Sequence, residues 1–173
     1  MKKTIKIAVI VIGVLAVALF VFRIWTKSSS PFEKVELSQG ELNVTVEYCR
    51  PYMRGRKIFG ELVPFGTVWR TGANEATVIT FSKNVRLAGN QVKAGKYSLW
   101  TIPNKKNWTV ILNRETGQWG TNYNEKDNIL SFVVPSAELG QTIDQFTIQL
   151  KSAEKGIDMS LNWENTGVNV PVR

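Results

Sequence analysis

Residues 42–49 read LNVTVEYC, with an apolar side chain at every second position. Leu42, Val44, Val46 and Tyr48 alternate with polar or charged residues, as they do in a strand that buries one face and exposes the other. The stretch therefore predicts a half-buried β-strand. Short runs of similar composition follow it at close spacing through the rest of the chain.

These strand-like runs are separated by residues that favour turns. The runs are VWRT, ATVITFS, VRLA, KYSLWTIP, WTVILNR, ILSFVV, TIDQFTIQLK, GIDMSLNW and VNVPV. Turn signals stand at residues 89–90, 103–107, 135–136 and 155–156. Only residues 56–62 and 136–140 leave room for a turn or two of helix. The pattern lacks crossover helices, so it predicts an antiparallel all-β domain of about ten strands, a β-sandwich or jelly roll.

The amino-terminal segment departs from this pattern. An uninterrupted apolar run from Ile7 to Phe22 follows three lysines. With its flanks, this run is just long enough for a hydrocarbon core of about 30 Å. The alternative, a cleaved signal peptide, requires small residues at a cleavage site, and the following sequence offers few. We therefore expect residues 1–27 to form one uncleaved transmembrane helix that serves as a signal-anchor.

Charge around this helix predicts the orientation of the protein. Three lysines and the amino terminus precede the apolar run, whereas two cations follow it. Under the positive-inside rule the amino terminus is cytoplasmic. Residues 28–31 then form a linker, and residues 32–173 form a β domain on the periplasmic or extracellular side. The predicted location is the cell membrane, with the lipid bilayer as a partner of the helix.

Composition excludes several classes of function. Five of the 22 basic residues and none of the 14 acidic residues lie in residues 1–27, so the β domain is only weakly basic. A nucleic-acid binder normally has a basic face across the whole domain, so we expect no nucleic-acid partner. The chain has no histidine, which removes His-ligated zinc and His-dependent nucleophiles. We expect no metal or cofactor, and we interpret the single Cys49 as an unreactive thiol.

Two long stretches interrupt the strands. Residues 49–66 hold Arg50, Arg54, Arg56 and Lys57, and their apolar residues predict a loop that packs back onto the domain. This basic cluster is suited to anionic lipid head groups or envelope polysaccharide, and equally to solvent. The second stretch, residues 113–128, places a tryptophan, Trp119, between glycines in a polar loop.

The stretch VWRTGANEATVITF, residues 68–81, supplies the main candidate site. In a hairpin, Arg70 and Glu75 would lie nearly opposite each other, either as an ion pair that fixes the turn or as part of a binding site. In the second interpretation Arg70, Asn74 and Glu75 converge with Arg56 and Trp119. Arginine offers a fork for a carboxylate or phosphate, and tryptophan offers a stacking face for a sugar.

Several segments resemble a known bacterial envelope family. The run GRKIFGELVPFGTVWRTGANEATVITFS, with AGKYSLWTIP, WTVILN, QWG and LNWENTGVNVPV, is similar to the family catalogued as domain of unknown function 2911. The resemblance covers about residues 32–173 and implies a secreted or envelope-facing β domain. Members of that family often carry a cleavable signal peptide, whereas this chain is expected to be anchored. The family implies no particular activity.

Three functions are compatible with these observations. The first is a membrane-anchored extracytoplasmic module that binds a small-molecule or polysaccharide ligand, anionic or sugar-like, through Arg56, Arg70, Asn74, Glu75 and Trp119. The second is a hydrolase that uses Glu75 with Glu61, since paired carboxylates are required for such chemistry. The third is an envelope scaffold without a small-molecule site. Whether the protein is an enzyme stays open at this point, and no catalytic residue is assigned.

Overall fold

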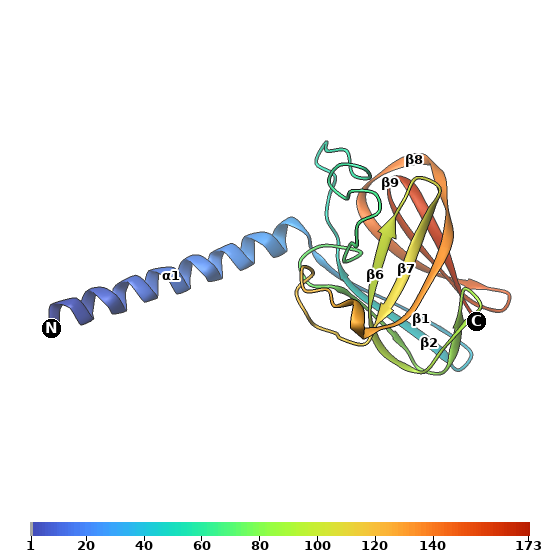
Figure 1. Cartoon of the computed structure of the whole chain (residues 1–173), viewed down its shortest axis with the longest axis horizontal. Coiled ribbons are helices and arrows are strands. Elements are labelled where there is room, and N and C mark those ends of the chain that lie inside the picture. Colours follow the sequence, from blue (N-terminus) through green and yellow to red (C-terminus); the bar gives the residue numbers. More distant parts are fainter. Residues whose placement is uncertain (1) are drawn as a thin grey trace.

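The computed structural model describes the backbone of residues 2–173 and the side chains of residues 5–7, 10–21 and 29–173. It contains one long helix, α1 (Lys2–Ser29), followed by a β domain. Figure 1 shows α1 projecting away from the β domain. The helix continues to Ser29, and the first strand begins at Phe32.

The β domain consists of antiparallel strands in one hydrogen-bonded sheet, in the order β1-β2-β3-β6-β7-β8-β9-β4-β5. The antiparallel all-β class predicted from the sequence is confirmed. The elements are β1 (Phe32–Gln39), β2 (Leu42–Cys49), β3 (Thr77–Phe81), β4 (Val85–Leu87), β5 (Asn90–Val92), β6 (Gly95–Pro103), β7 (Asn107–Asn113), the 3-10 helix η1 (Glu125–Asp127), β8 (Asn128–Ala153) and β9 (Gly156–Val172).

Strand β2 carries the alternation with which the sequence analysis began. Leu42, Val44, Val46 and Tyr48 are buried, and the residues between them are half-exposed. The strand pairs with β1 on one side and β3 on the other. Its buried face therefore points into the domain core, as predicted.

The two long strands differ from the expectation. The sequence predicts separate strands at residues 129–134 and 142–151, with a turn at Pro135 and room for a short helix at 136–140, and this prediction is wrong. Strand β8 runs through all of them, pairing with β7 as far as Pro135 and with β9 from Ser136 onward. Proline is tolerated where a strand changes its partner, because its missing N–H breaks no continuous ladder.

The predicted short strand at residues 68–71 is reduced to a single bridge. Trp69 donates its backbone N–H to the carbonyl of Thr101 at 2.7 Å and accepts from the Thr101 N–H at 2.9 Å. The chain then leaves the sheet until Thr77. This bridge attaches the candidate turn to β6.

Aromatic side chains fill the centre of the core. Trp69 stacks on Trp163 with a ring separation of 5.7 Å, and Trp108 and Phe146 lie at 6.2 and 4.9 Å from Trp69. Phe59, from the long loop, packs 5.0 Å from Trp108. The prediction that the loop packs back onto the domain is confirmed by Ile58, Phe59 and Val63, which are buried.

A carboxylate holds this loop in place. Glu164 of β9 accepts hydrogen bonds from the backbone N–H groups of Ile58 at 3.3 Å and Phe59 at 3.1 Å. Hydrogen bonds to a charged acceptor are stronger than neutral ones. Glu164 itself has a φ of 54°, in the left-handed region. The loop that carries the arginines is therefore fixed to the sheet at its middle.

Helix α1 exposes large apolar side chains along its length. Ile5, Ile12 and Phe20 are 60%, 66% and 65% exposed, and the other large apolar residues described on α1 are similar. Within the described residues no helix meets the length and hydropathy needed to cross a membrane. Lys2, Lys3, Arg23 and Lys27, on which the predicted orientation partly depends, lie outside the described side chains.

Candidate functional site

The turn between Trp69 and Thr77 is closed by hydrogen bonds and contains two left-handed residues. Thr71 has a φ of 54° and Asn74 a φ of 60°. The Thr77 hydroxyl donates to the carbonyl of Thr71 at 2.6 Å, and the indole N–H of Trp69 donates to the carbonyl of Gly72 at 3.0 Å. Such conformations cost free energy in residues other than glycine, and they cluster at functional sites.

Arg70 leaves this turn half-buried. Its side chain crosses Gly120 so closely that a Cβ on Gly120 would lie 2.1 Å from the Arg70 Cδ. Burial lowers the pKa of its guanidinium below the ordinary value.

The second loop meets the turn through its backbone. Glu75 and Trp119 form an isolated antiparallel bridge, in which Ala76 N–H donates to Gln118 at 3.1 Å and Gly120 N–H donates to Asn74 at 2.9 Å. The Trp119 side chain is 43% exposed. The two loops predicted to converge therefore do so, although the indole of Trp119 lines none of the pockets described below.

Glu75 lines a pocket of about 310 Å³ on the β2 side of the turn. Its Oε2 lies 3.9 Å from the thiol of Cys49, which donates to it. The other lining residues are mainly apolar, except for Glu47. Glu47 lies 3.6 Å from Lys96 in an ion pair. We call this space the Glu75 pocket.

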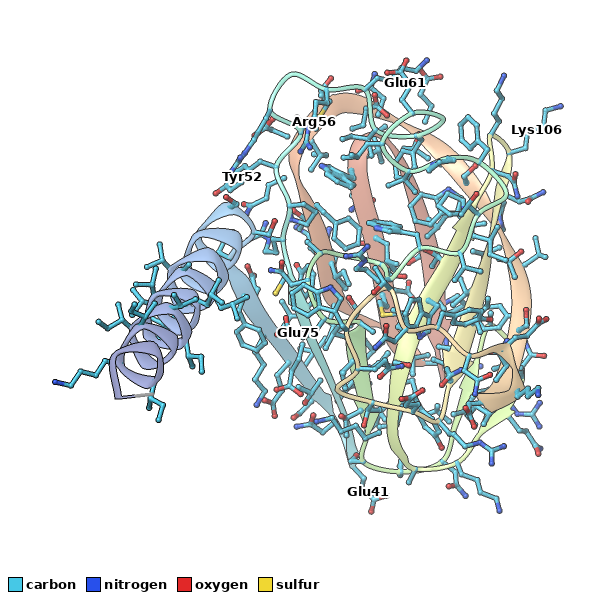
Figure 2. All side chains as sticks on the ribbon, turned by 60° about the vertical axis from the view of Figure 1, so that its left-hand side comes forward. Glu41, Tyr52, Arg56, Glu61, Glu75 and Lys106 are labelled. Carbon is cyan, nitrogen blue, oxygen red and sulfur yellow. The ribbon has the colours of Figure 1, made fainter. Side chains whose placement is uncertain are left out.

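A second pocket, of about 220 Å³, lies where α1 meets the domain. We call it the arginine pocket, and its lining residues are Ser29, Ser30, Pro51, Tyr52, Arg54, Arg56 and Asn74. Figure 2 shows Tyr52 and Arg56 close to the end of α1 that joins the domain. Two of the five predicted site residues, Arg56 and Asn74, thus share one pocket.

In the arginine pocket, Arg56 is held by backbone carbonyls, whereas the side-chain amide of Asn74 has a donor without an acceptor. Arg56 donates from Nε to the carbonyl of Met53 and from Nη2 to the carbonyl of Tyr52, both at 2.9 Å, which fixes its guanidinium plane. Asn74 is only 8% exposed, and its Nδ2 is buried without a hydrogen-bond partner in the described part of the chain. A buried amide without an acceptor costs about 1–3 kcal/mol.

Arg54 and the two serines were not predicted as site residues. Arg54 was assigned only to a basic loop surface, and Ser29 and Ser30 to a linker. In the structure Arg54 Nη2 lies 3.4 Å from the carbonyl of Ser29. The sequence Arg-Gly-Arg at 54–56 was the available signal for a shared arginine site, because it places two guanidinium groups close together in one loop.

Glu61 lies away from Glu75. It is paired with Lys57 at 3.7 Å on the exposed part of the loop. Figure 2 shows Glu61 at the top of the β domain and Glu75 near its middle, at distant points of the connection between β2 and β3. Glu61 lines neither of the two pockets. Among the residues whose side chains are described, no group of three potential metal ligands is present.

A match to a known protein family covers nearly the same residues as the β domain. The profile of a family described as Protein of unknown function (DUF2911) matches residues 30–172. The chain belongs to this family. The DUF2911 region thus begins at the last lining serine of the arginine pocket and ends with β9. No curated protein and no solved structure matches the chain.

Proposed function

We propose that this protein is a membrane-anchored, extracytoplasmic module that binds an anionic ligand in the arginine pocket. One observation carries the proposal: the buried Nδ2 of Asn74 lacks an acceptor beside two arginines. Buried polar groups in folded proteins are nearly always hydrogen-bonded. An anion seated between Arg54 and Arg56 would supply the missing acceptor once the Asn74 amide turns toward the pocket.

Charge supports an anion over other ligands. Arg54 and Arg56 line the pocket, and no carboxylate does. Arginine forks match carboxylate and phosphate oxygens with paired hydrogen bonds. Because backbone carbonyls hold the Arg56 guanidinium in one orientation, little side-chain entropy is lost when a ligand binds.

The other predicted residues have supporting roles in this proposal. Arg70 and Trp119 hold the second loop over the turn, and the turn fixes Asn74 in its left-handed conformation. Glu75 faces the separate Glu75 pocket. Since Glu61 and Glu75 share no pocket, the geometry favours a binding module over a hydrolase with these two carboxylates.

We further propose that the sheet closes into a two-layered β-sandwich and that α1 holds it at the cell membrane. Contacts of β1 with both β8 and β9 support the first point, because these strands are not neighbours of β1 in the sheet. The large apolar side chains described on α1 support the second, since each of them is at least half exposed. The predicted orientation, with a cytoplasmic amino terminus, is kept.

Calorimetric titration of the full chain in a neutral maltoside detergent tests the anion site, with inorganic phosphate and glucuronate as probes. Asn74→Asp keeps a residue that tolerates a positive φ and replaces the amide donor by a carboxylate. We expect it to weaken binding at least about tenfold, or about 1.4 kcal/mol.

The matched control is Lys106→Gln, which removes one positive charge on the opposite side of the domain (Figure 2). It is expected to leave binding unchanged. If the wild type binds neither probe, or if Asn74→Asp binds both as tightly as the wild type, the binding proposal is wrong and the scaffold interpretation replaces it.

A further inference from the structure

We infer that the ligand of the arginine pocket is the phosphate of an anionic phospholipid in the bilayer that holds α1. This inference rests on the proposed function and names its ligand. It is carried by the position of the pocket, by the donors that line it and by the exposed aromatic residues around it.

The position of the pocket follows from the end of α1. Ser29 is the last residue of the helix, and both Ser29 and Ser30 line the pocket. Val21 is the last exposed large apolar residue described on α1, and Ser29 follows roughly 12 Å further along the axis at 1.5 Å per residue. A helix embedded by its apolar part would bring Ser29 to the head-group layer beside the hydrocarbon core.

The loop arginines are tied to this end of the helix. Arg54 Nη2 lies 3.4 Å from the Ser29 carbonyl, and Arg56 is bonded to the Tyr52 carbonyl. Figure 2 shows Tyr52 and Arg56 beside the same end of α1. Both positive charges therefore lie beside the end of α1 that joins the domain, next to the lipid head groups of the leaflet from which this end of the helix would emerge.

The donors and the size of the pocket fit a head group. Two guanidiniums, the orphan amide of Asn74 and the serine hydroxyls can surround phosphate oxygens. A pocket of about 220 Å³ admits a head group and leaves the acyl chains outside, in the bilayer.

Exposed aromatic residues at the same end favour a membrane over a soluble anion. Tyr52 is 37% exposed and lines the pocket. Phe32, two residues after the pocket's Ser30, lines the Glu75 pocket and is 65% exposed. Aromatic rings are favoured at the interface between bilayer and water, because one side of the ring is apolar while the other remains wet. A pocket for a free anion has no need of them.

The experiment measures the thermal midpoint of the full chain in maltoside micelles with three additives in separate arms. These are inorganic phosphate, short-chain phosphatidylglycerol and short-chain phosphatidylcholine. Because a ligand that binds only the folded state raises the midpoint, each additive reports its own affinity. We expect phosphatidylglycerol to give the same shift as phosphate at an at least about tenfold lower concentration, and phosphatidylcholine to give little.

The variants separate the site from general effects of a charged lipid. The phosphatidylglycerol shift is expected to disappear in Asn74→Asp and Arg54→Gln and to persist in Lys106→Gln. If phosphate raises the midpoint and phosphatidylglycerol is no better, the lipid inference is overturned while the anion proposal stands. If the lipid shift survives in Asn74→Asp, the lipid acts elsewhere and the inference is also overturned. If neither additive has an effect, both proposals fail.

Discussion

Replacing Gly120 by alanine tests whether the second loop sits on the turn as described. A Cβ at this position would lie 2.1 Å from Arg70 Cδ, 2.5 Å from Arg70 Nε and 2.7 Å from the carbonyl oxygen of Asn74. Non-bonded carbon atoms are comfortable at about 3.5–4.0 Å. The Arg70 side chain can move, but the Asn74 carbonyl belongs to the backbone of the turn.

The expected cost has two parts. Forcing an extra carbon into a filled space costs about 1–3 kcal/mol. Pushing the loop away also lengthens the 2.9 Å hydrogen bond from the Gly120 N–H to the Asn74 carbonyl, whose loss costs about 0.5–1.5 kcal/mol. Together they amount to about 1.5–4.5 kcal/mol, which lowers the thermal midpoint by roughly 3–18 °C for a domain of this size.

Thermal unfolding followed by tryptophan fluorescence measures this change. Gly140→Ala is the matched control, because its added Cβ meets nothing within 4 Å and we expect a change within about 0.5 kcal/mol. Arg70→Ala combined with Gly120→Ala should recover about 1 kcal/mol, since the side-chain part of the clash is removed. A Gly120→Ala variant as stable as wild type would refute the placement of Arg70 across Gly120.

Two further predictions concern the core. Glu164→Gln should destabilise the long loop by about 1–3 kcal/mol, because a neutral amide is a weaker acceptor for the N–H groups of Ile58 and Phe59. Hydrogen exchange at those two amides should become faster. Unchanged exchange would contradict the role of Glu164 in holding the loop. Burial raises the pKa of Tyr48 above its usual value of 10.0, so the unfolded chain loses this proton first and stability falls as the pH rises above about 10. Tyr48→Phe should flatten that alkaline decline of the midpoint, and an equally steep decline in the variant would contradict it.

The sheet was predictable where burial alternates along one strand. Residues 42–49 show the alternation in both the sequence and the structure. The strand β8 was not predictable as one element. Pro135 has the composition of a turn, and only the tertiary arrangement shows that it marks the change of pairing from β7 to β9.

The candidate site was predictable in part, for a similar reason. Arg56 and Asn74 share a pocket as expected, but the assumed hairpin does not form, because Thr71 and Asn74 both adopt positive φ values and redirect the chain. Arg70 therefore points toward Gly120. The contribution of Ser29 and Ser30 depends on where α1 meets the long loop, and no local pattern encodes that.

The long excursion between β2 and β3 has a consequence for protein engineering. These strands are neighbours in the sheet, so residues 50–76 leave it and return to the adjacent position. Lengthening such a closed loop costs little entropy, about 0.6 kcal/mol for each doubling. The exposed part of this segment can therefore accept insertions while the sheet stays unchanged. Any replacement must keep Ile58, Phe59 and Trp69, because these three buried side chains complete the core.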